Sequence, residues 1–156
     1  MNKTILFFLA LMLVTTTACG RGNSNNNPVK EETMATEGNG KVIHLTKAEF
    51  LAKVYNFEKN PEEWKYEGDK PAIVDFYADW CGPCKLTSPI IEELSEEHKD
   101  VSFVKVNVDN NQELASQYSV FSIPTFIVFK DGKLATQFVG AMGKEGFEEQ
   151  LNKAKM

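Results

Sequence analysis

Apolar positions along residues 41–156 follow two alternating patterns. Continuous apolar runs predict three strands, at residues 42–45, 72–77 and 101–108. Elsewhere apolar residues recur at helical spacing, which predicts helices around residues 50–55, 86–94, 114–118 and 147–151. The run AIVDFY at 72–77 is nearly all apolar, as expected for a strand that is covered on both faces.

Local signals refine the helix boundaries. Thr46 is a suitable N-cap for the first helix because its hydroxyl can accept a backbone N–H. The segment NPEE at 60–63 combines a cap residue, a proline at the first helical position and an acidic first turn, so it predicts a short additional helix. Pro89 interrupts a helical pattern, which predicts a kink there.

A hairpin is the clearest element of the second half. Apolar runs at 125–130 and 134–139 flank Asp131 and Gly132, a pair that favours a tight turn with positive φ. Strands separated by helices favour parallel pairing, and the hairpin adds an antiparallel edge. The predicted fold class is therefore α/β, with one mixed central sheet flanked by helices on both faces.

The first 18 residues are expected to be a signal peptide of the lipoprotein type. Lys3 supplies a positive charge, and residues 5–14 form an unbroken apolar run that is followed by small and hydroxyl residues. A run of that length suits a signal peptide, whereas a spanning helix needs about 20 apolar residues. The alternative is a buried helix of the folded domain, but no polar face recurs at helical spacing.

Residues 19–40 are expected to attach and tether the exported domain. The sequence around Cys19 resembles a bacterial lipobox, in which the signal is cut before a cysteine that carries lipid, although Thr16 stands where an aliphatic residue is usual. An ordinary signal peptidase would also accept Ala18 and would leave Cys19 as a free thiol. Residues 20–40 are rich in Gly and Asn and contain no Leu, Ile or aromatic residue, which predicts a flexible tether.

Composition excludes several classes of protein. The 156 residues include 17 Lys or Arg and 22 Asp or Glu, so the formal net charge is −5. Because nucleic-acid binding needs a cationic face, this acidity and the lack of a dense basic block argue against a nucleic-acid partner. Residues 41–156 are enough for one domain with its own core. Three cysteines are too few for a disulfide-based mini-protein, and their odd number implies that one differs in role.

The segment WCGPC at 80–84 lies between a predicted strand and a predicted helix. At a helix N-terminus, free backbone N–H groups and the helix dipole would stabilise a thiolate at Cys81, and the thiolate is the nucleophile. Cys84, one turn further, would be placed to resolve a mixed disulfide. Pro83 suits the first helical turn because its missing N–H is not needed there.

Two other interpretations of this cysteine pair are weaker. A metal site would need further ligands, whereas the third cysteine lies across the tether and His44 and His98 are isolated in the sequence. An inert structural disulfide would enclose so small a loop that it would constrain the unfolded chain little.

Several segments together resemble the thioredoxin family. They are AIVDFYADWCGPCKLTSPIIEEL at 72–94, KVNVD at 105–109, FSIPTFIVFKDG at 121–132 and FVGAM at 138–142. The resemblance covers residues 41–156, and WCGPC with a downstream Ile-Pro-Thr is far more specific than a bare pair of cysteines. It implies the thioredoxin fold and a thiol–disulfide oxidoreductase that uses its own cysteine pair, with no small-molecule cofactor and no metal.

The resemblance also implies catalytic roles. Cys81 matches the exposed attacking cysteine, and Cys84 matches the buried resolving cysteine. Asp75 matches the buried aspartate that assists proton transfer at the resolving cysteine, and Lys105 matches the lysine beside it. A carboxyl group inside an apolar strand is expected to have a raised pKa.

A substrate groove is implied by the same resemblance. Pro124 matches a cis-proline that faces the disulfide, and Ile123 would offer backbone hydrogen bonds to an extended substrate. Trp80 matches the aromatic residue that shields the nucleophile. The other expected substrate-binding positions are Gly82 and Pro83 of the motif, and Gly140 and Ala141 of the loop that completes the groove.

Two departures from the family pattern stand out. Tyr77 occupies a position where many thioredoxins have a second tryptophan. The segment 57–70 is longer than the usual connection, and its Trp64 and Tyr66 are expected either to pack on the first helix or to touch a partner.

The resulting expectation is a monomeric protein-disulfide reductase that acts on exported client proteins. It would work in the periplasm or on the outer face of the cell membrane, anchored by lipid on Cys19. Because exported compartments are oxidising, a membrane thiol-transfer protein is the expected electron donor. One alternative is a disulfide oxidant or isomerase in the same compartment, and the other is a redox-independent binding module with a thioredoxin fold.

Metabolic labelling tests the anchor. We expect the mature protein to incorporate a fatty-acid probe at Cys19. Such lipidation would anchor the protein, because each buried methylene contributes about 0.8 kcal/mol and several acyl chains hold a protein at a membrane far better than one. The measurement is probe fluorescence of the purified mature protein, and an unlabelled protein would contradict lipid attachment.

Overall fold

The computed structural model describes residues 40–63 and 65–155. The predicted signal peptide, Cys19, the tether up to residue 39 and Trp64 lie outside the described residues. The strands are β1 (Val42–His44), β2 (Ala72–Tyr77), β3 (Ser102–Asn107), β4 (Thr125–Lys130) and β5 (Lys133–Val139). The helices are α1 (Lys47–Lys53), α2 (Gly82–Glu97), α3 (Gln112–Gln117) and α4 (Lys144–Lys155).

The sheet is mixed, as the sequence predicts. Its strand order is β1-β3-β2-β4-β5. β3 pairs in parallel with both β1 and β2, whereas β4 is antiparallel to β2 and β5. The turn between β4 and β5 has positive φ at Asp131 (48°) and Gly132 (79°), which confirms the predicted tight turn.

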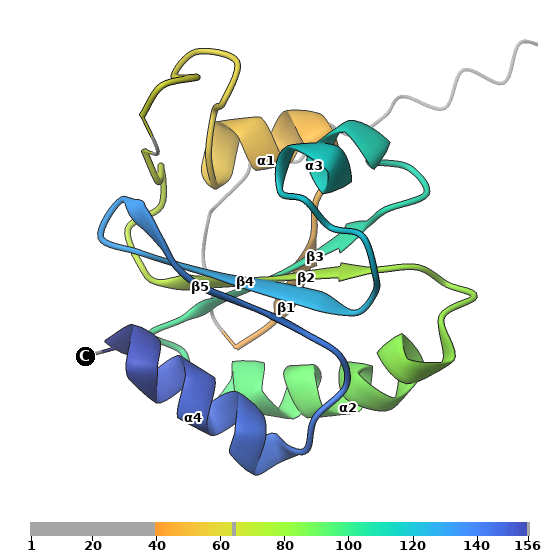
Figure 1. The fold of residues 1–156 in the computed structure, drawn as a ribbon. Helices are drawn as coiled ribbons and strands as arrows, with labels where there is room; N and C mark the ends of the chain where they lie inside the picture. The colour runs from red at the N-terminus through yellow and green to blue at the C-terminus, as the bar shows by residue number, and fades with distance from the viewer. Residues whose placement is uncertain (1–39, 64, 156) are drawn as a thin grey trace, which may run out of the picture. The chain divides into compact units, whose positions relative to one another are not determined.

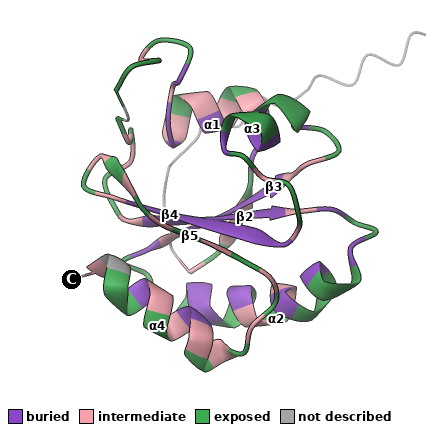
Figure 2. Ribbon diagram, in the orientation of Figure 1, coloured by how far each residue is buried: buried purple, intermediate pink, exposed green. Residues whose placement is uncertain are grey.

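Helices cover both faces of this sheet (Figure 1). α1 and α3 lie over one face, where Phe50, Leu114 and Tyr118 join a core with alternate residues of the central strands. α2 and α4 lie over the other face, where Leu94 and Phe147 belong to a second core. Figure 2 shows the central strands buried between these layers. Fully burying one such side chain contributes about 1.5–3 kcal/mol, so α4 is held chiefly by its apolar face.

Strand alternation decides which face each residue of β2 meets. Val74 and Phe76 belong to the core under α1 and α3, and Ile73 belongs to the core under α2 and α4. Because side chains alternate across a strand, Asp75 lies on the same face as Ile73, toward α2. Its register partner on β3 is Lys105. The register therefore places a carboxylate and an ammonium side by side beneath the helix that carries the cysteines.

Local capping follows the sequence in α1. Thr46 is the N-cap: its hydroxyl accepts the backbone N–H of Glu49, and the Glu49 carboxylate accepts the backbone N–H of Thr46. In α2, Pro89 lies inside the helix, which continues to Glu97. Its missing N–H leaves the carbonyl of Lys85 without the usual helical donor.

The predicted helix at 60–63 is wrong, because residues 61–63 form bends instead. The hydroxyl of Tyr55 donates to the backbone carbonyls of Asn60 (2.6 Å) and Glu63 (3.2 Å). A buried tyrosine thus satisfies carbonyls that a helix would have paired with its own N–H groups. Tertiary packing of Tyr55 overrides the local helix-start signal.

Tyr66 is partly buried and packs against the core that α1 and α3 cover. It forms an isolated bridge with Tyr55, just after α1, and its ring stacks on Phe129 of β4 with 6.0 Å between centroids. Of the two arrangements expected for this residue, the structure shows intramolecular packing near the end of α1. Burial raises the pKa of Tyr66 to about 12.

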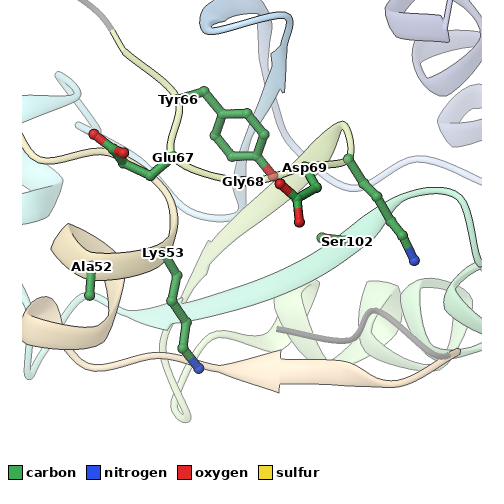
Figure 3. A pocket seen from close by; sticks show the side chains of 8 residues that line it. Ala52, Lys53, Tyr66, Glu67, Gly68, Asp69 and Ser102 are labelled. Carbon is green, nitrogen blue, oxygen red and sulfur yellow. The ribbon is translucent and has the colours of Figure 1, made fainter. Parts of the chain in front are cut away.

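A small pocket of about 100 Å³ lies beside Tyr66, before β2 and at the start of β3 (Figure 3). It is lined by Ala52, Lys53, Tyr66, Glu67, Gly68, Asp69, Lys70 and Ser102. Because the cysteines follow the opposite end of β2, this pocket takes no part in their chemistry. None of the helices in the described part of the chain is both long and apolar enough to span a membrane.

Candidate active site

Cys81 and Cys84 form a disulfide at the start of α2. Cys81 is the N-cap residue, and its sulfur accepts the backbone N–H of Cys84 at 3.2 Å. A side-chain acceptor at this position meets the free N–H groups and the positive end of the helix dipole. When the disulfide is reduced, the same environment favours a thiolate at Cys81.

The expectation that Cys81 is exposed needs correction. The residue is only 4% exposed, against 1% for Cys84. Ala78 is buried with the disulfide, and Tyr77, Val108 and Ile123 pack against this small cluster. Access to the disulfide is therefore confined to a narrow part of its surface, and the two cysteines differ little in exposure in the oxidised form.

Asp75 and Lys105 form a buried ion pair on the face of the sheet that α2 covers. Lys105 Nζ lies 2.7 Å from Asp75 Oδ2, and both side chains are almost fully buried. Lys105 also donates to the hydroxyl of Ser88 at 2.9 Å, and that hydroxyl donates to the backbone carbonyl of Cys84 at 3.1 Å. A continuous set of hydrogen bonds thus links the carboxylate to the residue that carries the second thiol.

The pKa of Asp75 is raised, as the sequence predicts, and the main cause is burial. The positive charge of Lys105 and its hydrogen bond act in the opposite direction, and His44 opposes the shift more weakly. Desolvation of a buried carboxylate costs several kcal/mol, which a single ion pair offsets only in part. Asp75 Oδ1 is buried and has no hydrogen-bond partner among the described residues, so one oxygen is available to take up a proton.

Tyr77 forms one wall of this cluster. Lys105 Nζ lies 4.5 Å from the centroid of its ring, and the hydroxyl of Tyr77 lies 3.1 Å from His44 Nδ1. The aromatic group that replaces the usual tryptophan therefore contacts the lysine directly.

The predicted substrate loop comes together around Pro124. The Ile123–Pro124 peptide bond is cis, as expected, and Ile123 packs against the cysteine pair. Gly140, with φ of 99°, donates its N–H to the carbonyl of Pro124 at 2.8 Å, and the exposed Ala141 follows it. Gly82 and Pro83 are also exposed, at the first turn of α2. The structure thus brings Ile123 to the cysteine pair and joins Gly140 to the adjacent Pro124.

Trp80 lies on the surface and not in the core. Its side chain is 69% exposed, and its indole N–H donates to Asp109 Oδ2 at 3.0 Å. Beside it a groove of about 350 Å³ is lined by Trp80, Val108, Val120, Phe121, Ser122 and Ile123. Phe121 is 94% exposed, so the groove ends in an unusually accessible aromatic ring.

Sequence reasoning missed three residues of this site. Phe121 could have been noticed as an aromatic residue directly before Ser-Ile-Pro, outside any apolar period. Asp109 is the last residue of the segment KVNVD, which carries the family resemblance but gives no sign of a partner for Trp80. Ser88 carried no sequence signal, because a hydroxyl within an amphipathic helix is usually solvated.

A second polar cluster lies at the other end of α2. Ligand atoms of Glu97, His98 and Glu148 lie within 4.8 Å of one another, so His98 is not isolated as the sequence suggested. Lys144 binds Glu97 at 2.6 Å, and Lys155 Nζ lies 3.1 Å from His98 Nδ1. Two ammonium groups at this cluster oppose the binding of a further cation.

Stability measured against pH tests the environment of Asp75. Because burial raises its pKa in the folded state, the folded protein binds this proton more tightly than the unfolded chain does. The carboxyl therefore stabilises the fold below the ordinary pKa of 3.8, and that contribution is lost as pH rises through the raised value. Asp75→Asn has no such proton. The free energy of unfolding of the variant minus that of wild type should rise with pH, measured by urea unfolding of the oxidised proteins from about pH 4 to about pH 8.

Asp100→Asn is a matched control. The hydrogen bond from Lys155 lowers the pKa of Asp100, so its contribution to stability is fully present above the ordinary pKa of 3.8 and is lost only at lower pH. The difference between Asp100→Asn and wild type should therefore stay constant over the pH range in which that of Asp75→Asn rises. If the difference for Asp75→Asn instead falls with pH, Lys105 and not burial has the larger effect on the pKa of the Asp75 carboxyl.

Comparison with known proteins agrees with this geometry. Residues 41–153 match the profile of the family described as Thioredoxin. A thioredoxin of Borreliella burgdorferi is 44% identical over 108 residues, which cover 68% of this chain and 91% of the relative. Thioredoxins of Alicyclobacillus acidocaldarius and Bacillus subtilis are 50% and 49% identical over 86 and 82 residues, covering 54% and 52% of this chain and 82% and 79% of the relatives.

The matched region includes the disulfide, the ion pair and the cis-proline loop. Members of this family exchange disulfides through their own pair of cysteines and need no cofactor. The chain belongs to the thioredoxin family and is a thiol–disulfide oxidoreductase.

Proposed function

We propose that this protein reduces the disulfides of exported client proteins while it is tethered by lipid on Cys19 to the outer face of a membrane. The observation that carries the redox part is the Cys81–Cys84 pair at the N-terminus of α2. The lipobox-like sequence before Cys19 and the polar segment after it support export and tethering.

The proposed reaction begins at Cys81. Its thiolate attacks one sulfur of the client disulfide, and the other client sulfur leaves as a thiolate that is protonated by water. The backbone N–H of Cys84, which lies 3.2 Å from the Cys81 sulfur, helps to hold the negative charge before the attack. The product is a mixed disulfide between Cys81 and the client.

The second step belongs to Cys84. Its thiol gives up a proton, and its thiolate attacks the Cys81 sulfur and displaces the client sulfur. Asp75 is proposed to take up this proton, because its Oδ1 has no hydrogen-bond partner among the described residues and its raised pKa lies nearer to that of a thiol. Lys105 keeps the carboxylate oriented through Oδ2. Cys81 and Cys84 end oxidised, and the client ends with two thiols.

The groove beside the disulfide is proposed to hold the client chain. Ile123 would offer its backbone to an extended segment, as in β-strand addition, and Gly140 fixes this loop through Pro124. Trp80 and the groove walls would cover apolar side chains next to the client cysteine. Only small, accessible disulfides or unfolded segments fit, because Cys81 itself is so little exposed.

Net reduction requires a supply of electrons. An exported compartment is oxidising, so we propose that a membrane thiol-transfer protein returns Cys81 and Cys84 to the dithiol form. The dipeptide Gly82-Pro83 between the cysteines favours a reductant, because strong oxidants and isomerases more often have other dipeptides there.

A trapping variant tests the proposed clients. In the full chain, Cys84→Ser cannot resolve the mixed disulfide, so clients and donor should accumulate on Cys81 as adducts that separate on reduction. The measurement is affinity purification from cells under non-reducing conditions, followed by identification of the released proteins. Exported proteins are expected among them.

Cys81→Ser is the matched control, since it removes the attacking sulfur and should leave no adducts. An empty trap, or adducts equally abundant on both variants, would contradict client reduction. Adducts formed only with proteins that are never exported would contradict the proposed compartment.

Equilibration with glutathione tests the direction of the reaction. We expect a reduction potential near the thioredoxin value of about −270 mV, read from the fraction of oxidised protein at each glutathione ratio. A potential as high as about −120 mV would reject net reduction in favour of a disulfide oxidant.

A further inference from the structure

Ser88 occupies a central position between the ion pair and the helix that carries the cysteines. Its hydroxyl accepts from Lys105 Nζ at 2.9 Å and donates to the backbone carbonyl of Cys84 at 3.1 Å. A hydroxyl has one hydrogen to donate and lone pairs to accept, so both bonds can form together. Ser88 is therefore the direct link between Lys105 and the backbone of Cys84.

Lys105 depends on this hydroxyl because its ammonium is buried. An ammonium has three N–H donors. Asp75 Oδ2 and Ser88 Oγ accept two of them, and the ring of Tyr77 lies against Nζ at 4.5 Å. Without the Ser88 oxygen, one N–H donor of this buried ammonium would lose its partner, and the ammonium would be held less firmly against Asp75.

Helix α2 is also weakened next to this position. Pro89 lacks the N–H that would bind the carbonyl of Lys85. Two side-chain hydroxyls reinforce the preceding turn: Thr87 donates to the Cys84 carbonyl at 3.0 Å, and Ser88 donates to the same oxygen. Of these two hydroxyls, only that of Ser88 also binds Lys105 among the described residues.

We propose that Ser88 is a positioning residue for the resolving step: its hydroxyl holds the Lys105 ammonium against Asp75 and ties both to the carbonyl of Cys84. The proposal rests on the proposed dithiol reaction, in which Asp75 takes up the proton of Cys84. Ser88 neither gains nor loses a proton in this step. By holding Lys105 it favours the ionised carboxylate and keeps it in place as the base for the resolving step.

The groups that set the charge of Asp75 come from several elements. Lys105 of β3 and His44 of β1 favour the ionised carboxylate. Tyr77 of β2 lies against Lys105, and burial raises its pKa above the ordinary 10.0, so its phenol is uncharged near neutral pH. Phe126, opposite Asp75 on β4, is apolar, and α2 contributes the hydroxyl of Ser88 through Lys105. Without that hydroxyl the Lys105 ammonium, which is the main charge opposing the shift, is held less firmly at Asp75, so the pKa of Asp75 should rise.

The first test is a direct titration of Asp75 in the oxidised protein, where neither cysteine titrates. Carboxyl ¹³C chemical shifts are followed against pH in wild type, Ser88→Ala and Thr87→Val. Both variants remove a hydroxyl that donates to the Cys84 carbonyl, but only the first removes a bond to Lys105. We expect Ser88→Ala to raise the midpoint by on the order of half a unit to one unit, and Thr87→Val to leave it unchanged.

The second test follows the resolving step with 5,5′-dithiobis(2-nitrobenzoate). Attack by Cys81 on this disulfide releases one coloured thiolate, and attack by Cys84 on the resulting mixed disulfide releases a second. In Ser88→Ala the acid limb of the second-phase rate should move to higher pH by the same amount as the titration midpoint of Asp75. At pH values on the acid side of this limb, the second phase should be about three- to tenfold slower than in wild type. Ser88→Thr keeps a hydroxyl and should restore the wild-type profile.

The remaining outcomes separate the role of Ser88 from the dithiol reaction itself. An unchanged or lowered midpoint in Ser88→Ala, an equal shift in Thr87→Val, or no restoration by Ser88→Thr would overturn the role of Ser88. A wild-type protein that releases the first thiolate but never the second would contradict the proposed dithiol reaction itself. A normal two-phase wild type with an unshifted Ser88→Ala contradicts only the positioning role.

Discussion

Strand β2 lies in the middle of the sheet with helices over both faces, and its register determines where the active-site groups lie. Its side chains alternate between two cores, so Asp75 must face α2 if Val74 and Phe76 face α1 and α3. The strand ends at Tyr77, and the chain then turns into the helix that begins at Gly82. Packing of an apolar strand thereby fixes both the buried carboxyl and the cysteine pair.

The free-energy cost of burying the Asp75 carboxylate explains the groups that surround it. A carboxylate buried alone would lose its hydration without compensation. Lys105, its register partner, restores part of that loss, and the ring of Tyr77 and the hydroxyl of Ser88 surround the ammonium in turn. Compensation is incomplete, since Asp75 Oδ1 remains unpaired in the described part of the chain and the pKa of Asp75 remains raised. An incompletely compensated carboxyl is what a proton acceptor near neutral pH requires.

Local sequence signals predicted helices, strands and turns correctly where neighbouring residues alone determine them. The apolar run of β2, the Thr46 cap and the Asp131-Gly132 turn appear where the sequence indicated them. The helix predicted at NPEE does not form, because the hydroxyl of Tyr55 binds the carbonyls that a helix would need. The helix-start signal takes no account of a buried side-chain donor a few residues earlier. The expectation that Cys81 is exposed was also wrong, because Ile123, which belongs to another loop, packs against the disulfide.

The sequence by itself determined the fold class, the cysteine pair and the family resemblance, because these depend on residue type, spacing and the alternation of strands and helices. Only the tertiary structure decided which groups meet. The bonds from Trp80 to Asp109 and from Lys105 to Ser88 join segments that are far apart in the chain, and the bond from Ser88 to the carbonyl of Cys84 follows no sequence pattern. Hydrogen bonds of this kind act over about 3 Å in space and leave no period in the chain, so they become visible only after the sheet and α2 are packed together.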